Sequence, residues 1–176
     1  LDFVKLKHEG QYRKYTNHPY WFHLVSVSRN LVRNEVENLS VEIALCHDLF
    51  EDTDCSIWEL NNFLEQIGYE ADEIVIILNS TIWLTDFFTK ESFPNKNRKE
   101  RKELEAERLG KAPSIVQTVK YADMIDNSRS IIDRDDKFAK IYIAEKRMYI
   151  DAMTEGNEKL RNEALQIIKD YEQSSN

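Results

Sequence analysis

The stretch HDLFED, residues 47–52, places one histidine and three carboxylates within a run of helix-forming residues. On an α-helix each residue turns by about 100°, so the four polar side chains would share an arc of roughly 140°. They are His47, Asp48, Glu51 and Asp52. The flanking apolar residues predict a buried face beside them. Three carboxylates there repel one another unless a cation lies among them, and a divalent metal ion is the simplest such partner. The alternative is a solvated helix face.

Bulk composition predicts one soluble domain spanning residues 1–176. The chain of 176 residues is long enough for one domain with a sizeable core and too short for two comfortable ones, and 41% hydrophobic residues indicate a folded globule. No stretch approaches the roughly 18 apolar residues of a membrane span and no signal sequence opens the chain, so a cytoplasmic protein without a membrane partner is expected. The net charge of −8 argues against a nucleic-acid binder, although local basic groups can hold a small anionic substrate. The oligomeric state stays open.

The scarcity of glycine (four) and proline (three), with no alternating strand pattern, predicts an all-α protein. Pro19 and Pro113 are expected to open helices, Ser40 and Ser56 to cap them, and Gly68 to end one. The apolar stretch after Gly68 would also suit a strand, because it is rich in Ile and Val. Helices are expected over about 3–14, 19–34, 40–52, 57–68, 69–84, 98–111 and 114–131, with two more within 136–173 and a loop over 86–97.

Cysteine usage narrows the kind of metal site. Cys46 and Cys55 are the only cysteines and form no CxxC pair. This excludes a structural zinc site built on thiolates and argues against a disulfide framework. Cys46 is expected to pack as a small core residue.

A metal ion at His47 and Asp48 needs further ligands, because adjacent residues of one helix supply only two. His23 lies among apolar residues in PYWFHLVSV, where an unpartnered imidazole is costly; the alternative is a satisfied core histidine. Asp123 is an acid within another apolar helical stretch, TVKYADMIDN. Two imidazoles and two carboxylates suit a divalent ion such as Mn²⁺, Zn²⁺ or Fe²⁺.

The order of these signals resembles the HD-domain metal-dependent phosphohydrolases. Three stretches look closest to the stand-alone small alarmone hydrolases related to the Rel and Spo proteins: HEGQYRKYTNHPYWFH (8–23), ALCHDLFEDTDCS (44–56) and VKYADMIDNSRSI (119–131). They are similar to the family motifs H-x-G-Q-x-R-K, HD-x-x-ED-T and K-x-A-D-x-x-x-N-x-R. The resemblance implies an all-α HD-domain helical bundle with a metal site between core helices.

The resemblance also implies a role for each motif residue. The metal ligands would be His23, His47, Asp48 and Asp123. Glu51 and Asp52 would then perform the acid–base work, one on the attacking water and the other on the leaving oxygen. For Asp52 the alternative is helix termination.

Four further residues are candidates for substrate binding. Arg13 and Lys14 match basic positions that contact the nucleotide in alarmone hydrolases, and a guanidinium can stack on a base or bridge phosphates; the alternative is an exposed basic pair. Lys120 and Asn127 match the family's lysine and asparagine. The alternative for Lys120 is an ion pair with an acid, and the alternative for Asn127 is a buried capping role.

The basic run KNRKERK, residues 96–102, has two interpretations. Lys96 and Arg98 would close over a pyrophosphate. The slightly preferred interpretation is an exposed helix face, balanced by glutamates at positions 100, 103, 105 and 107.

The activity that the resemblance implies is Mn²⁺-dependent 3′-pyrophosphohydrolysis of guanosine 3′,5′-bis(diphosphate), ppGpp, or pppGpp, giving GDP or GTP and pyrophosphate. Met124 and Asp126 stand where alarmone hydrolases often carry Arg and His, and Asn17 stands where a glycine is common, so base and phosphate specificity stay open. One alternative is a phosphohydrolase of another nucleotide, such as NADPH at its 2′-phosphate or a nucleoside phosphate. Another is a catalytically silent nucleotide-binding HD module, against which the intact HD and ED pairs argue.

Overall fold

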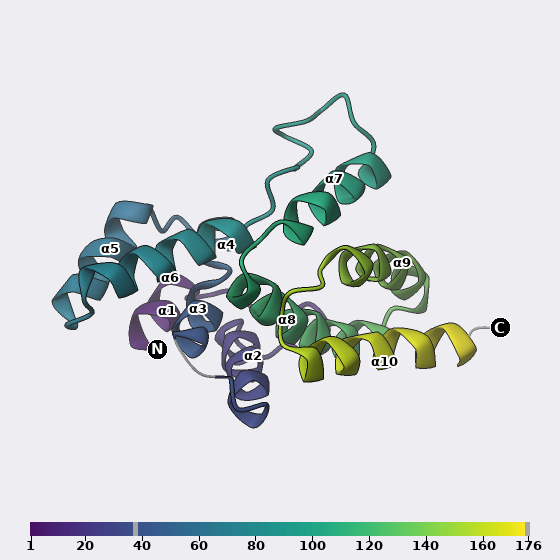
Figure 1. Cartoon of the computed structure of the whole chain (residues 1–176), viewed down its shortest axis with the longest axis horizontal. Coiled ribbons are helices and arrows are strands. Elements are labelled where there is room, and N and C mark those ends of the chain that lie inside the picture. Colours follow the sequence, from purple (N-terminus) through teal and green to yellow (C-terminus); the bar gives the residue numbers. More distant parts are fainter. Residues whose placement is uncertain (37–38, 175–176) are drawn as a thin grey trace. The chain divides into compact units, whose positions relative to one another are not determined.

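The computed structural model describes residues 1–36 and 39–174. In these residues the chain forms ten α-helices and no strand, and one isolated antiparallel bridge joins Tyr12 to Pro19. The prediction of an all-α protein is confirmed. None of the described helices combines the length and the apolar character that crossing a membrane requires. Figure 1 shows the helices in their order along the chain. They belong to two compact units.

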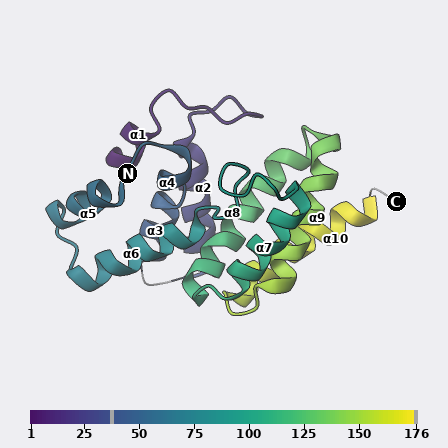
Figure 2. The same cartoon turned by 90° about the horizontal axis from the view of Figure 1, so that it is seen from above.

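The first unit, Leu1–Thr85, contains the first six helices. They are α1 (Asp2–Lys7), α2 (Trp21–Arg33), α3 (Ser40–Cys46), α4 (Leu49–Asp52), α5 (Ile57–Gln66) and α6 (Ala71–Leu84). Helix α2 packs against α3, and α6 packs against α3, α4 and α5 (Figures 1 and 2). Fully buried aliphatic side chains of this unit include Leu24, Leu31, Ile43 and Leu49.

The second unit, Asp86–Asn176, contains four longer helices. They are α7 (Arg98–Gly110), α8 (Ser114–Ile132), α9 (Asp136–Ala152) and α10 (Glu158–Ser174). Helix α9 contacts the other three, and α8 also packs against α10 (Figure 2). Among the fully buried side chains are Val119, Ile125, Tyr149 and Leu160.

Several expected helix boundaries are confirmed. The Ser56 side chain accepts a hydrogen bond from the Glu59 backbone N–H at 3.2 Å and so caps α5. Gly68 follows the end of α5 with φ +92°, a conformation that glycine adopts without strain. The apolar stretch after Gly68 forms the helix α6, Ala71–Leu84, rather than a strand, and α7 follows the expected loop with Asn97 as its N-cap.

Other boundaries were predicted wrongly. The first helix ends at Lys7 instead of near residue 14, and Pro19 lies two residues before α2 begins. Ser40 is the first residue of α3 and not its cap, because its hydroxyl donates to the Val36 carbonyl at 3.2 Å. Leu39 precedes it in a left-handed conformation, with φ +40°.

The expected single helix over residues 40–52 is broken at His47 and Asp48, between α3 and α4. Nδ1 of His47 lies 2.7 Å from the Ala44 carbonyl oxygen. In a continuous helix that carbonyl would accept from the Asp48 N–H alone, so the side chain competes with the helical ladder at this point. The break presents the His47 ring and the Asp48 carboxylate to one another.

Candidate metal centre

Two histidines and one aspartate of the first unit converge on a shared point. His23 lies on α2, His47 ends α3, and Asp48 follows it directly. The Nε2 atoms of His23 and His47 lie 3.6 Å and 3.1 Å from Oδ2 of Asp48. A ligand atom of one ring lies within 4.8 Å of a ligand atom of the other. Both imidazoles are almost fully buried, at 2% and 1% exposure.

The chemistry of this donor set fits a bound cation. Because a carbonyl oxygen only accepts hydrogen bonds, the contact with Ala44 makes Nδ1 of His47 the donor and leaves the lone pair of the neutral ring on Nε2. That lone pair faces a carboxylate oxygen of Asp48, a second acceptor, at 3.1 Å. Two acceptors at this distance need a proton or a metal ion between them. Backbone orientation of a ligating imidazole through its second nitrogen is typical of metal sites.

Asp123 lies on α8 of the second unit, and two of its helical neighbours hold its carboxylate. Lys120 Nζ lies 3.0 Å from Oδ2, and Asn127 Nδ2 donates to Oδ1 at 2.5 Å. The carboxylate is only 8% exposed. Both residues that were expected to bind substrate therefore contact Asp123. Lys120 thus pairs with an acid, the alternative expected for it, and Asn127 donates to the same carboxylate. Contact of either residue with a substrate stays a prediction.

Tyr20, to which the sequence assigned no role, contacts two carboxylates of the first unit. The Tyr20 hydroxyl lies 2.8 Å from Oδ2 of Asp48 and 2.7 Å from Oδ2 of Asp52. One hydroxyl hydrogen serves one carboxylate at a time, so a proton on the second carboxyl would complete both short contacts. Partial burial and then the Asp48 charge raise the pKa of Asp52, against the lowering effect of the Tyr20 hydrogen bond. The raised pKa favours the protonated form of the Asp52 carboxyl more than in a free aspartate, and its catalytic role stays a prediction.

The opening motif of the sequence holds this tyrosine in place. The buried His8 ring stacks on Tyr20 with centroids 4.9 Å apart. Nδ1 of His8 lies 2.8 Å from Gln11 Oε1, and Gln11 Nε2 donates to the Asp52 carbonyl at 2.6 Å. The histidine and glutamine of H-x-G-Q thus connect Tyr20 to the end of α4. The motif itself was the signal for these residues, but the contact of Gln11 with Asp52 spans 41 positions and is not visible in local spacing.

The other expected site residues of the first unit lie nearer the surface. Glu51 is exposed on α4. Arg13 and Lys14 lie in the segment that connects α1 to α2, where Arg13 is half-buried and Lys14 is exposed. Nζ of Lys14 lies 3.0 Å from the Tyr15 hydroxyl. A catalytic role for Glu51 and nucleotide contacts of Arg13 and Lys14 stay predictions.

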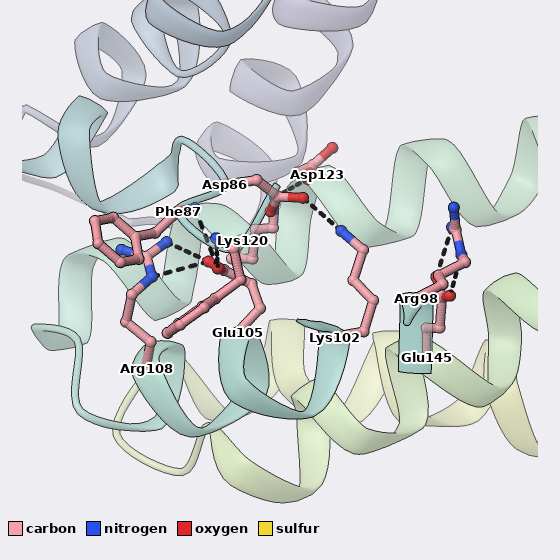
Figure 3. A network of polar contacts seen from close by, with 10 residues as sticks. Asp86, Phe87, Arg98, Lys102, Glu105, Arg108, Lys120, Asp123 and Glu145 are labelled. Atoms are coloured by element: carbon pink, nitrogen blue, oxygen red, sulfur yellow. Dashed lines mark hydrogen bonds and ion pairs between the residues drawn. The ribbon is translucent and has the colours of Figure 1, made fainter. Parts of the chain in front are cut away.

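The charged helix α7 is less uniformly exposed than expected (Figure 3). Arg98 donates to both oxygens of Glu145 on α9, at 2.5 Å and 3.0 Å. Glu105, expected on the solvent face, is 1% exposed and contacts Arg108 and the Phe87 N–H. The position of the glutamate alone does not reveal its burial, because two of the donors to its carboxylate are backbone N–H groups of the preceding loop.

Comparisons with known proteins support the fold. No protein-family model and no curated protein matches the sequence. Among solved structures, the chain matches that of a metazoan ortholog of SpoT, which hydrolyzes ppGpp and plays a role in starvation responses. The TM-score is 0.77 at 23% identity, over 96% of this chain and 91% of that chain. At this identity the match establishes the fold alone. The chain therefore has the all-α fold of that ppGpp hydrolase, as its resemblance to the HD-domain family predicted.

Proposed function

We propose that this protein is a metal-dependent 3′-pyrophosphohydrolase of guanosine 3′,5′-bis(diphosphate) and its pentaphosphate, giving GDP or GTP and pyrophosphate. The observation that carries the proposal is the 3.1 Å approach of His47 Nε2 to Asp48 Oδ2, in a fold shared with a protein that hydrolyzes ppGpp. We further propose that residues 1–176 form one cytoplasmic domain that acts on a small nucleotide, without a nucleic-acid or membrane partner.

The metal ligands in this proposal are His23, His47, Asp48 and Asp123, and the ion is Mn²⁺. Two imidazole nitrogens and two carboxylates suit Mn²⁺, with Zn²⁺ and Fe²⁺ as the other candidates. The fixed tautomer of His47 and the two contacts that orient Asp123 support this assignment. A bound divalent ion would supply an activated water and neutralise negative charge at the phosphoryl group.

Glu51 and Asp52 perform the proton transfers. One carboxylate takes a proton from the attacking water, and the other carboxyl gives one to the ribose 3′ oxygen as its bond to phosphorus breaks. The Tyr20 hydroxyl, which contacts Asp48 and Asp52, supports a proton-transfer role for the Asp52 carboxyl.

Arg13 and Lys14 bind the nucleotide in this proposal, with the planar guanidinium stacked on the purine. Lys120 and Asn127 orient Asp123 and, from the same face of α8, contact a phosphate or ribose oxygen. The half-buried position of Arg13 and the polar contacts of Lys120 and Asn127 support these roles.

A nucleotide panel tests the proposal. Purified protein with Mn²⁺ is incubated with ppGpp, NADPH and nucleoside monophosphates, and the products are separated by chromatography with an assay specific for pyrophosphate. Conversion of ppGpp to GDP and intact pyrophosphate is expected. Orthophosphate alone, or a preference for NADPH or a monophosphate, would favour the other nucleotide hydrolases. No turnover by folded, metal-loaded protein would favour the silent binding module.

A further inference from the structure

Three lysines of the second unit gather around two carboxylates. Lys102 of α7 forms an ion pair with Asp86, and Lys120 of α8 pairs with Asp123 at 3.0 Å (Figure 3). The third is Lys146 of α9, whose pKa responds to the charges of all four of these residues. Three helices and the start of the loop before α7 therefore bring one excess positive charge to this cluster.

Lys146 is the member of the cluster without an ion pair. Its Nζ lies 4.4 Å from the ring centroid of Tyr149 and 5.1 Å from that of Tyr142. In the described part of the chain no carboxylate lies within ion-pair distance of this nitrogen. Burial and then the Lys120 charge lower its pKa to about 8, so the amine is still mainly protonated at neutral pH. The aromatic faces hold a cation that lacks a matched anion.

Two further buried acids of the second unit are engaged elsewhere. Glu145 binds Arg98 through both carboxylate oxygens. Glu105 is buried between Arg108 and the backbone of Phe87. Neither carboxylate is available to neutralise the cluster without breaking a contact that joins α7 to α9 or to the preceding loop.

A buried hydroxyl adds a hydrogen-bond donor to the same cluster. The Tyr149 hydroxyl has no hydrogen-bond partner among the residues that the structure describes. Burial and then the Asp86 charge raise its pKa, so it stays protonated, and the Lys120 charge acts on it in the opposite direction. Since a buried hydroxyl without a partner is costly, a ligand that accepts its hydrogen bond would be stabilised here.

We propose that Lys146, together with Lys102 and Lys120, forms a subsite for the distal phosphoryl group of a diphosphate. The inference rests on the proposed function, in which Asp123, the partner of Lys120, is a metal ligand and the proximal phosphoryl group is at the metal. A phosphoryl group supplies the missing anion and accepts several ammonium hydrogen bonds. In this proposal the metal holds the proximal phosphoryl group and Lys146 binds the distal one, so the subsite selects a diphosphate over a monophosphate.

Pyrophosphate binding tests the subsite without requiring turnover. Calorimetric titration of pyrophosphate into the Mn²⁺-loaded full chain is compared for the wild type, Lys146→Met and the control Lys140→Met, an exposed lysine of the same helix. All variants are titrated at identical metal and pyrophosphate concentrations. The heat of Mn²⁺–pyrophosphate complex formation in solution is then the same in each titration and cancels in the comparison. Loss of one charge-assisted hydrogen bond should weaken pyrophosphate binding about tenfold or more in Lys146→Met. Lys140→Met should bind as the wild type does.

Two further arms make the outcome specific. Orthophosphate should bind Lys146→Met and the wild type within about twofold, and Lys146→Arg should largely restore pyrophosphate binding, because it keeps the charge. Lys146→Gln replaces Lys146→Met if the latter fails to show a cooperative melt. Unchanged pyrophosphate binding in a folded Lys146 variant overturns the subsite, even if ppGpp is hydrolyzed. Weakened pyrophosphate binding, with no nucleotide turned over by the wild type, supports the subsite and overturns the proposed hydrolase.

Discussion

The Tyr20 hydroxyl, at 2.8 Å from Asp48 and 2.7 Å from Asp52, is the contact that joins a proposed ligand to a proposed catalytic acid. Tyr20→Phe keeps the ring that stacks on His8 and removes only this oxygen. We expect kcat to fall roughly 10- to 100-fold, on the scale of impaired proton transfer, while metal content is unchanged.

Tyr12→Phe is the matched control, because Tyr12 is 61% exposed and its ring remains in place after the substitution. Steady-state kinetics and metal analysis on both variants decide the matter. Loss of metal from Tyr20→Phe, or full activity in it, would contradict the role assigned to the hydroxyl.

At the residue scale, the candidate metal ligands that lie in short motifs were predictable from the sequence. The sequence pattern identified His23, His47 and Asp48, and the structure brings these three together. The role of Tyr20 was not predictable, because its partners lie 28 and 32 positions away. Asn17, at a position where the alarmone hydrolases that the sequence resembles commonly have glycine, adopts φ +56°, a left-handed conformation that asparagine tolerates.

The loop between α6 and α7 is tied to α7 by Glu105. Its carboxylate accepts from the Phe87 and Phe88 backbone N–H groups, both at 3.2 Å, and pairs with Arg108. Glu105→Gln removes the charge that serves these donors. We expect the free energy of unfolding to fall by about 1–3 kcal/mol, the cost of disturbing buried hydrogen bonds.

Glu103→Gln on the same helix is the control, since the Glu103 side chain is 50% exposed and forms only a 3.8 Å pair with Lys99. Urea denaturation should show no more than a few tenths of a kcal/mol for this exposed pair. Equal stability of the two variants would contradict the anchoring role of Glu105.

Lys146 gives the protein a pH-dependent stability that can be isolated by mutation. Its folded-state pKa of about 8 lies below its ordinary value of 10.5. Between these values the unfolded chain binds more protons than the folded chain, so this lysine makes the free energy of unfolding rise with pH from about 8 to 10.5. Cys46 and Cys55, with pKa values raised by burial to about 12 and about 11, act in the opposite direction.

The thiols contribute equally to the free energy of unfolding of the wild type and of Lys146→Met. Their contribution therefore cancels when the two free energies are subtracted. Urea denaturation at pH 7.5 and pH 9.5 should show that the free energy of unfolding of the variant, relative to that of the wild type, is lower at pH 9.5 than at pH 7.5. Stability curves that stay parallel over this interval would contradict the depressed pKa.

At the element scale, the existence of the helices was predictable from apolar periodicity and caps. Two features of the helices were not predictable: the break between α3 and α4, and the burial of Glu105 on α7. The pairing of His47 with the Ala44 carbonyl breaks the helix that spacing predicted as continuous. The burial of Glu105 depends on loop backbone that no helical period describes. Both departures are long-range or side-chain effects that single-residue propensities do not contain.

At the scale of the whole molecule, the all-α class was predictable from the sequence, and the fold that the order of motifs predicted agrees with the match to the metazoan SpoT ortholog. Composition was less informative about internal organisation. It predicted one domain, whereas the described chain separates into the units Leu1–Thr85 and Asp86–Asn176, and whether they behave as one domain stays a prediction. Composition averages over both units and carries no signal of where one core ends.

The central claim, a metal ion held by histidines in a hydrolase, is tested most directly by electron–nuclear double resonance of the Mn²⁺-loaded protein. We predict one Mn²⁺ per chain with nitrogen couplings from two imidazoles. His47→Ala should lose one coupling and most of the metal, whereas Glu51→Gln should keep both couplings while ppGpp turnover falls by roughly 10² or more. A bound Mn²⁺ without nitrogen coupling, or one unaffected by His47→Ala, would contradict the proposed metal centre.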